Sequence, residues 1–155
     1  MITTERLTIR IASDDEMRTL ISNEKDEELK KAYGEMLGCC ISHPDMREWY
    51  AAWFISLRDG ERIGDLCFKG ITDDGGVEIG YGLLTGYCGK GYATEAVGAV
   101  VEWALKQDGV KYVEAETEES NIASQSVLMK CGFVPTGKNG EEGPRFVLRG
   151  QISDK

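Results

Sequence analysis

The sequence predicts one domain of the α/β class, because strand-like and helix-like segments alternate along its 155 residues. Alternation of polar and apolar residues indicates strands, apolar residues at helical spacing indicate helices, and glycine-containing turns separate them. The predicted order is strand, helix, helix, three strands, helix, strand, helix and strand. No internal repeat or linker divides residues 1–155. A domain of this size buries roughly 68 to 70% of the surface that its unfolded chain exposes, so the core needs no disulfide or structural metal.

The N-terminal segment is predicted to hold one strand and two helices. Residues 5–12 alternate in the manner of a half-buried strand. Ser13 and Glu16 form the S-x-x-E pattern of a capping box, which starts a helix at Asp14. A second helix is expected from Asp26 to Cys40, because apolar residues recur there on one face: Leu29, Ala32, Tyr33, Met36, Leu37 and Cys40.

The middle of the chain is typical of an antiparallel meander. A strand ends at Arg58, the Asp59–Gly60 turn leads into a strand over residues 62–71, and a turn at residues 73–76 precedes a strand over residues 77–84. Two interpretations stay open for the aromatic residues at the start of this meander, which are core packing or the floor of a substrate pocket: Trp49, Tyr50 and Trp53.

The longest predicted helix follows a glycine-rich loop, carries apolar residues from Ala93 to Leu105 and ends before Gly109. A strand over residues 110–117, a short helix over 121–131 and a last strand over 145–150 complete the chain.

Composition excludes several classes of function. The chain carries 18 Lys and Arg against 27 Asp and Glu, a net charge of −9 that disfavours nucleic acid and anionic lipid as partners. No apolar run approaches the roughly 18 residues of a membrane span. Five cysteines without a C-x-x-C pair, and an N-terminus without an apolar signal core, predict a cytoplasmic protein. The single histidine, His43, has no partner for a zinc site or a Ser/His/Asp triad, so no metal site is expected.

The glycine-rich loop before the longest helix is the first candidate site. Gly89 and Gly91 allow a sharp turn and close approach of a ligand to backbone amides at a helix N-terminus, which suits a phosphate. A P-loop would need glycine and serine or threonine where Leu84 and Gly91 stand, and a Rossmann fingerprint would belong to a parallel unit rather than a meander. The alternative is a simple loop that starts a helix.

A second motif lies near the C-terminus, where Asn121 can cap a helix that ends at Gly132 and Phe133. Capping alone would explain both ends. Taken with the glycine loop, however, the chain resembles the GNAT superfamily of acetyl-CoA-dependent N-acetyltransferases. The segment 88–93 matches the family's phosphate loop Arg/Gln-x-x-Gly-x-Gly/Ala except at Cys88, and the family's later motifs are matched by Asn121, Ser124, Lys130, Gly132 and Phe133. Segments 4–10 and 77–81 resemble the branch that acetylates ribosomal-protein N-termini.

This resemblance implies a mixed, mostly antiparallel central sheet that is splayed at its middle and flanked by helices. Acetyl-CoA, the acyl-donor cosubstrate, would lie in the splay, with its pantetheine arm along residues 83–85 and its pyrophosphate on amides of residues 89–94. The helices between residues 14 and 40 would shape the site of the amine acceptor, which stays unidentified, and a homodimer is left open. The implied cosubstrate-binding residues are Leu83, Leu84, Thr85, Cys88, Gly89, Lys90, Gly91, Tyr92, Ala93, Thr94, Asn121, Ser124 and Lys130.

The implied reaction is direct attack of a neutral amine on the thioester. Many family members place a tyrosine, which protonates the leaving thiolate, where this chain has Leu128, so Ser124 or a water that it holds is the predicted donor. Glu78 is the predicted base, with Glu114 and Glu116 as competitors, and His43 is expected to be a loop residue. Because the tyrosine is missing, a catalytically weak acyl-CoA-binding sensor or interaction module stays as the alternative function.

Overall fold

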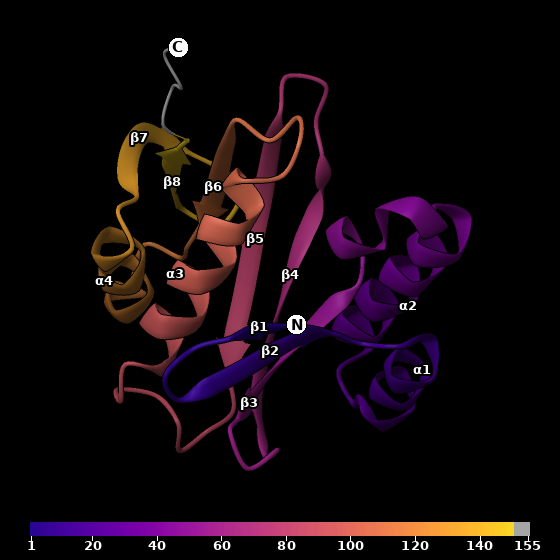
Figure 1. Cartoon of the computed structure of the whole chain (residues 1–155). Helices are drawn as coiled ribbons and strands as arrows, with labels where there is room; N and C mark the ends of the chain where they lie inside the picture. Colours follow the sequence, from indigo (N-terminus) through magenta and orange to yellow (C-terminus); the bar gives the residue numbers. More distant parts are fainter. Residues whose placement is uncertain (151–155) are drawn as a thin grey trace.

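Eight strands form one sheet in the order β1-β2-β3-β4-β5-β6-β8-β7 in the computed structural model, which describes residues 1–150 (Figure 1). The strands are β1 (Ile2–Thr3), β2 (Leu7–Ile11), β3 (Ala52–Leu57), β4 (Arg62–Ile71), β5 (Gly76–Leu83), β6 (Tyr112–Glu116), β7 (Val134–Asn139) and β8 (Pro144–Arg149). The helices are α1 (Asp14–Asn23), α2 (Glu27–Ser42), the short 3-10 helix η1 (Pro44–Trp49), α3 (Tyr92–Leu105) and α4 (Ile122–Lys130).

The predicted fold class is confirmed, including the opening in the sheet. Neighbouring strands run antiparallel except β5 and β6, which are parallel. This parallel pairing covers only three positions and ends at Glu78 and Glu114. Beyond that point β5 continues to Leu83 without pairing to β6, so the sheet is splayed at its middle.

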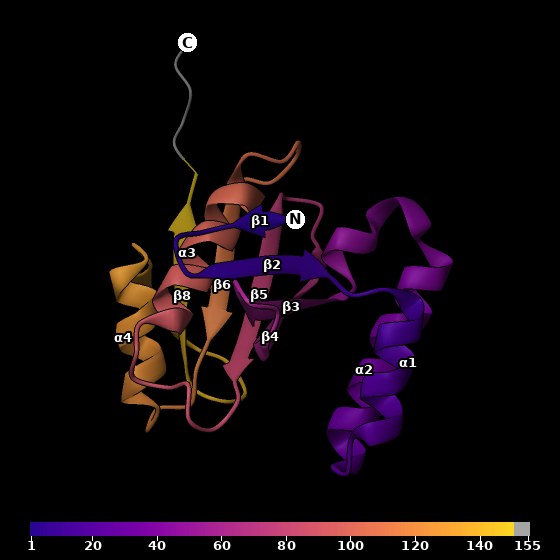
Figure 2. The same ribbon diagram turned by 60° about the horizontal axis from the view of Figure 1, so that its bottom comes forward.

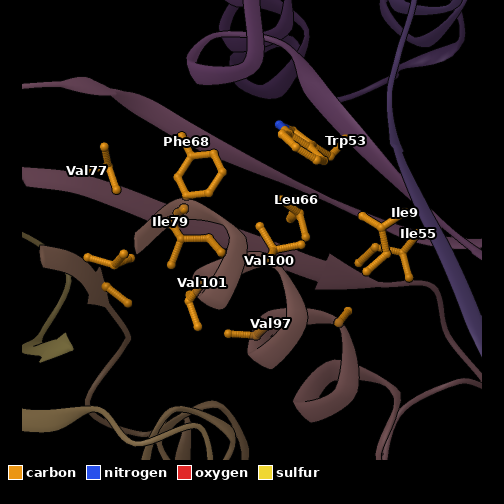
Figure 3. Close-up of a cluster of buried hydrophobic side chains, with 14 of the residues drawn as sticks. Ile9, Trp53, Ile55, Leu66, Phe68, Val77, Ile79, Val97, Val100 and Val101 are labelled. Atoms are coloured by element: carbon orange, nitrogen blue, oxygen red, sulfur yellow. The ribbon is translucent and has the colours of Figure 1, made fainter. Parts of the chain in front are cut away.

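Alternation along β3 explains how helices come to lie on both faces of the sheet. Trp53 and Ile55 point into a large core that includes residues of α3 and α4, whereas Ala52 and Phe54 point into a smaller core with α1 and α2. Figure 2 shows the two helix pairs on opposite sides of the strands. The large core, part of which appears in Figure 3, holds the sheet against the apolar face of α3.

Two of the three aromatic residues at the start of the meander are core residues. Trp49 and Trp53 are 6% and 3% exposed and pack around Phe68 and Trp103, with Trp49 edge-on to Phe68. Tyr50 is half-buried and lies beside a cavity between α2 and the sheet. The core interpretation is therefore confirmed for the two tryptophans.

Three elements were not predicted from the sequence. Strand β1 has two residues, too few for a periodic pattern, and β7 contains Pro135 and Gly137 and is mostly exposed. Helix η1 begins at Pro44, in a short stretch for which the sequence predicts no helix. None of the helices within residues 1–150 is long and apolar enough to cross a membrane.

The apolar face predicted for α2 exists, but the sheet covers only part of it. Only Cys40 on this helix is buried, while Leu29 is 41% exposed. The uncovered part of this face borders a cavity. The apolar residues that predict a core-packing helix therefore also form one wall of a groove.

Candidate active site

The loop between β5 and α3 takes a shape that glycine alone adopts without strain. Gly86, Gly89 and Gly91 have φ angles of +99°, +77° and +83°, in the left-handed region. Gly91 is the N-cap of α3 and supplies no side chain to the first amides of the helix. These amides, with the positive end of the helix dipole, can therefore receive an anionic group.

Residues at the N-terminus of the chain hold this loop in place. Glu95, in the first turn of α3, accepts hydrogen bonds from the Thr4 hydroxyl and the Arg6 amide and forms an ion pair with Arg6 at 2.7 Å. The Arg6 guanidinium also donates to the Lys90 carbonyl at 3.0 Å and lies 4.4 Å over the Tyr92 ring. We call these contacts of Thr4, Arg6, Lys90, Tyr92 and Glu95 the N-terminal clamp.

A cavity of about 410 Å³, which we call the loop cavity, lies between this loop, β5 and α4. It brings together most of the predicted cosubstrate-binding residues: Leu83, Cys88, Gly89, Gly91, Ala93, Thr94, Asn121, Ser124 and Lys130. It also includes residues that were not predicted, namely Tyr81, Gly82, Ala123, Ser126 and Val127.

Four predicted binding residues lie outside the lining of the loop cavity. The Leu84 amide donates to the Ile63 carbonyl at 2.7 Å, so it is not free to pair with a ligand, and Thr85 follows it in the turn. Lys90 and Tyr92 take part in the N-terminal clamp. Contact of these residues with the cosubstrate stays a prediction.

Tyr81 joins β5 to α4 beside the loop cavity. Its Oη lies 2.7 Å from Ser124 Oγ. Ser124 is itself held by Asn121, whose side-chain oxygen accepts a hydrogen bond from the Ser124 amide at 3.0 Å. Burial raises the pKa of Tyr81, so the phenol keeps its proton at neutral pH. Leu128 is fully buried in the core. The sequence does contain a signal for Tyr81, because this residue ends the segment 77–81 that resembles the family. The resemblance of that segment alone assigns the tyrosine no role.

The three candidate carboxylates share one cation. Parallel pairing of β5 and β6 places Glu78 opposite Glu114, and antiparallel pairing of β6 and β8 places Glu116 opposite Arg145. The Arg145 guanidinium donates hydrogen bonds to Glu78 at 2.9 Å, to Glu114 at 2.8 Å and to Glu116 at 2.5 Å. Burial favours a higher pKa for Glu78, but hydrogen bonds from Arg145 and Lys69 outweigh it and lower the pKa. Glu78 lines a smaller cavity of about 310 Å³ that reaches Ser124 and Tyr81. Its assignment as the base stays a prediction. The lowered pKa makes this carboxylate a weaker base than an ordinary glutamate.

A cavity of about 660 Å³, which we call the α2 groove, lies between α2 and strands β4 and β5. Its walls are mainly apolar, with Leu29 and Met36 from the helix and Leu66 and Phe68 from β4. The α2 groove and the loop cavity share Tyr81 and Gly82 in their linings. His43 is exposed at the C-cap of α2 and is not among the residues lining these cavities.

Comparison with known proteins agrees with this geometry. The model of the acetyltransferase (GNAT) domain matches residues 4–134. The chain belongs to the GNAT acetyltransferase family. It is 34% identical over 94 residues to the uncharacterized N-acetyltransferase YjdG of Bacillus subtilis, in an alignment that covers 59% of this chain and 56% of that protein.

Solved GNAT structures have the same fold. RimL, a ribosomal L7/L12 α-N-protein acetyltransferase solved in complex with coenzyme A, is 15% identical with a TM-score of 0.73, over 95% of this chain and 96% of that chain. A dodecameric spermidine N-acetyltransferase from Vibrio cholerae is 15% identical with a TM-score of 0.71, over 94% of this chain and 95% of that one. These two proteins are named for different acceptors, so the shared fold does not identify an acceptor.

The residues present fit a CoA thioester as the ligand of the loop cavity. Uncapped amides of α3 meet the requirement of a pyrophosphate, the unpaired edge of β5 beyond Glu78 can accompany an extended arm, and Tyr81 and Ser124 lie at the far end. Within residues 1–150, no cluster of three or more His, Cys, Asp or Glu side chains is arranged to hold a metal ion.

Proposed function

We propose that this GNAT-family chain transfers an acetyl group from acetyl-CoA directly to a primary amine. The observation that carries the proposal is the meeting of two cavities at Tyr81 and Gly82, one beside the glycine loop and one beside α2. A donor in the first cavity and an acceptor in the second would bring thioester and amine together at that point. Effective catalysis of a two-substrate reaction depends on this kind of juxtaposition.

The glycine loop supplies the binding energy for the cosubstrate. Hydrogen bonds to a charged group contribute about 1.5 to 3 kcal/mol each, so a few backbone amides at the start of α3 suffice to hold a pyrophosphate. The N-terminal clamp keeps those amides in position, because Arg6 fixes both the Lys90 carbonyl and the first turn of the helix through Glu95. Cys88, Asn121 and Lys130 border the same cavity.

The Tyr81 and Ser124 pair supplies the proton for the leaving thiolate. A buried phenol that keeps its proton is an acid at the time of reaction, and its hydrogen bond to Ser124 orients it. This pair replaces the tyrosine that the family pattern places at Leu128. It therefore favours an active enzyme over the sensor or interaction module that the missing tyrosine had suggested.

The acceptor must be neutral when it attacks. An amine with a pKa near 10.4 is mostly protonated at neutral pH, which costs roughly 4 to 5 kcal/mol, whereas an α-amine near 7.7 to 8 costs about 1 kcal/mol. Protein N-termini and small-molecule amines are both candidates. Glu78, as the predicted base, would act on a water beside Ser124, within the cavity that both residues line.

The test is release of CoA thiol from acetyl-CoA across a panel of peptides, polyamines, amino acids and alkylamines. For an acetyltransferase, the rate of thiol release increases with the concentration of one class of amine, and mass spectrometry detects the acetylated amine. Tyr81→Phe is the matched variant, since it keeps the ring and removes the acid. A folded protein that binds acetyl-CoA, yet releases no thiol with any amine, would instead be a binding module.

A further inference from the structure

Two carboxylates that the reaction, as described above, does not use line the α2 groove, Glu35 of α2 and Asp65 of β4. Asp65 of β4 lines the groove among apolar side chains, and its own side chain is 25% exposed. Its register is informative, because Asp65 pairs across the strands with Gly82, and the next residue, Leu66, pairs with Tyr81. The carboxylate therefore lies on the strand position directly across from the place where the two cavities meet.

The strand facing Asp65 leaves room for a ligand. Gly80 and Gly82 of β5 line the groove, and neither has a positive φ angle, so the backbone there would accept other residues. A Cβ atom added at Gly82 would have no heavy atom within 4 Å, and one added at Gly80 would meet only the Cys67 sulfur at 3.9 Å. The empty space beside Asp65 is thus bounded by glycine on one side and by α2 on the other.

Asp65 is held in place but keeps hydrogen-bonding capacity. Tyr33 of α2 donates from its hydroxyl to Asp65 Oδ2 at 3.2 Å, and Arg62 lies 3.8 Å from the same oxygen. Within residues 1–150, Oδ1 receives no hydrogen bond. One carboxylate oxygen is therefore positioned, and the other can accept from a ligand.

The charges around Asp65 come from three elements. Burial raises the pKa of Asp65, repulsion from Glu24 at the C-cap of α1 adds to this, and the Tyr33 hydrogen bond and Arg62 offset it only in part. Burial also raises the pKa of Tyr33, so this residue stays a hydrogen-bond donor. Asp65 is thus a stronger base than an ordinary aspartate, in contrast to the ion-paired Glu78.

The remaining charged groups of the groove are Glu35 of α2 and Lys69 of β4, and Lys69 is paired with Glu78 at 3.0 Å. Strand β5 adds no charge at its two glycines. An apolar groove lined by more carboxylates than cations is complementary to a cation that carries a hydrocarbon portion.

We propose that Asp65, oriented by Tyr33, binds the ammonium group of the acceptor and takes up its proton in place of Glu78, and that the acceptor is a primary amine attached to an apolar chain. This inference rests on the proposed function and names its substrate class. Asp65 takes one proton from R–NH3⁺, and the nitrogen lone pair then forms the C–N bond to the acetyl carbon. The C–S bond breaks, and the thiolate takes a proton from the Tyr81 hydroxyl. The nitrogen then loses its second proton to the Tyr81 oxygen, which restores the hydroxyl. The products are the amide, the CoA thiol and one proton, which Asp65 releases to water.

The first experiment measures binding without turnover. n-Hexylamine is titrated by calorimetry into protein saturated with CoA, and n-hexanol serves as the neutral probe of the same length. We expect Asp65→Asn to weaken hexylamine binding by about tenfold or more, since a hydrogen bond between charged groups is lost, and to leave hexanol and CoA binding unchanged. Asp108→Asn, which removes one negative charge at the exposed turn after α3, is the matched control and should bind hexylamine as the wild type does. Thermal unfolding checks that each variant is folded.

Two results would overturn the proposal. One is the absence of hexylamine binding to the wild type, and the other is an unchanged hexylamine affinity in folded Asp65→Asn, whether or not Glu78→Gln loses binding. Binding that depends on Asp65, without any amine-dependent release of CoA thiol, would reject the acetyltransferase function while supporting the amine site. The two conclusions thus fail separately.

The second experiment tests proton uptake through the pH dependence of kcat/KM. In the wild type, kcat/KM should fall at low pH as Asp65 becomes protonated. Tyr33→Phe removes a hydrogen bond that favours the ionised carboxylate, so this fall should move to higher pH, a change that loss of packing alone would not produce. In Asp65→Asn the deficit should be largest near neutral pH and shrink as pH approaches the pKa of the amine. A deficit of equal size at every pH would assign Asp65 to binding alone and reject the proton transfer.

Discussion

The loop cavity and the α2 groove meet at Tyr81, yet they are built by opposite means. The loop cavity depends on backbone: left-handed glycines, an uncapped helix and a clamp from the N-terminal residues. The α2 groove depends on side chains that leave a space unfilled. The sheet covers only half of the apolar face of α2, and β5 carries glycines opposite that face. Backbone geometry suits a cosubstrate shared by a whole family. Side-chain lining can change by single substitutions, which suits an acceptor that differs between relatives.

The largest effect is expected on the backbone side, at Gly91. In Gly91→Val, the left-handed φ of +83° is strained for valine, and the new Cβ would lie 3.2 Å from the Arg6 guanidinium. We expect acetyl-CoA affinity, measured by calorimetry, to fall by about a hundredfold or more, since two or more charge-assisted hydrogen bonds are lost.

The control for this variant is Gly109→Val, which has the same φ of +83° and nothing within 4 Å of the added Cβ. It should lose comparable stability and keep its affinity. Equal affinity in a folded Gly91→Val would mean that the pyrophosphate is not held at this loop.

The comparison also explains what could be predicted from the sequence. The glycine loop and the capping motif at Asn121 leave local signals, because φ angles and helix caps are properties of a few consecutive residues. The capping box at Ser13 and the meander are local in the same sense and are confirmed.

Features that depend on register left no such signal. The pairing of Asp65 with Gly82, the gathering of Glu78, Glu114 and Glu116 on Arg145, and the contact of Tyr81 with Ser124 join residues far apart in the chain. The amphipathic pattern of α2 was visible, but whether a neighbour covers that face is decided by tertiary packing.

The next largest effect is expected at the junction itself. Tyr81→Phe should lower kcat by roughly a hundredfold, the lower end of what a positioned general acid contributes, with acetyl-CoA affinity unchanged. Single-turnover rates of thiol release measure this. Ser124→Ala should lower kcat less, because it removes the partner of the phenol and not the acid. A smaller loss in Tyr81→Phe than in Ser124→Ala would make Ser124 the donor.

A moderate effect is expected when the N-terminal clamp is opened. Glu95→Gln removes the charge that Arg6 pairs with, so we expect acetyl-CoA affinity to weaken by only a few fold, in keeping with the modest energies of partly exposed ion pairs. Binding to the α2 groove should not change, which makes this variant a test of whether the two cavities are independent. A variant that weakened amine binding to the same degree would show that they are coupled.

The clamp also predicts a pH dependence of stability. Burial favours a higher pKa for Glu95, but hydrogen bonds from Thr4 and Arg6 outweigh it and lower the pKa in the folded protein. The clamp therefore stabilises the fold above the ordinary carboxyl pKa of 4.5, and this contribution is lost as the pH falls through the lowered value. Urea unfolding of the wild type and Glu95→Gln should differ most near neutral pH and converge in acid.

The smallest effect is expected at Cys88, where the family pattern has arginine or glutamine. Cys88 is exposed and borders the loop cavity, and its thiol cannot supply the hydrogen bonds of those side chains. Cys88→Arg adds a cation beside the proposed pyrophosphate site, so the affinity for CoA should rise by a few fold and the gain should shrink with added salt. Ser42→Arg, at the exposed end of α2, adds the same charge away from the loop cavity and should give no gain.

In the wild type, saturating CoA should slow alkylation of Cys88 by iodoacetamide more than that of Cys39, which lines the α2 groove. Equal protection of the two thiols, with no gain from arginine, would separate Cys88 from the cosubstrate and leave the backbone amides as the whole of the phosphate site.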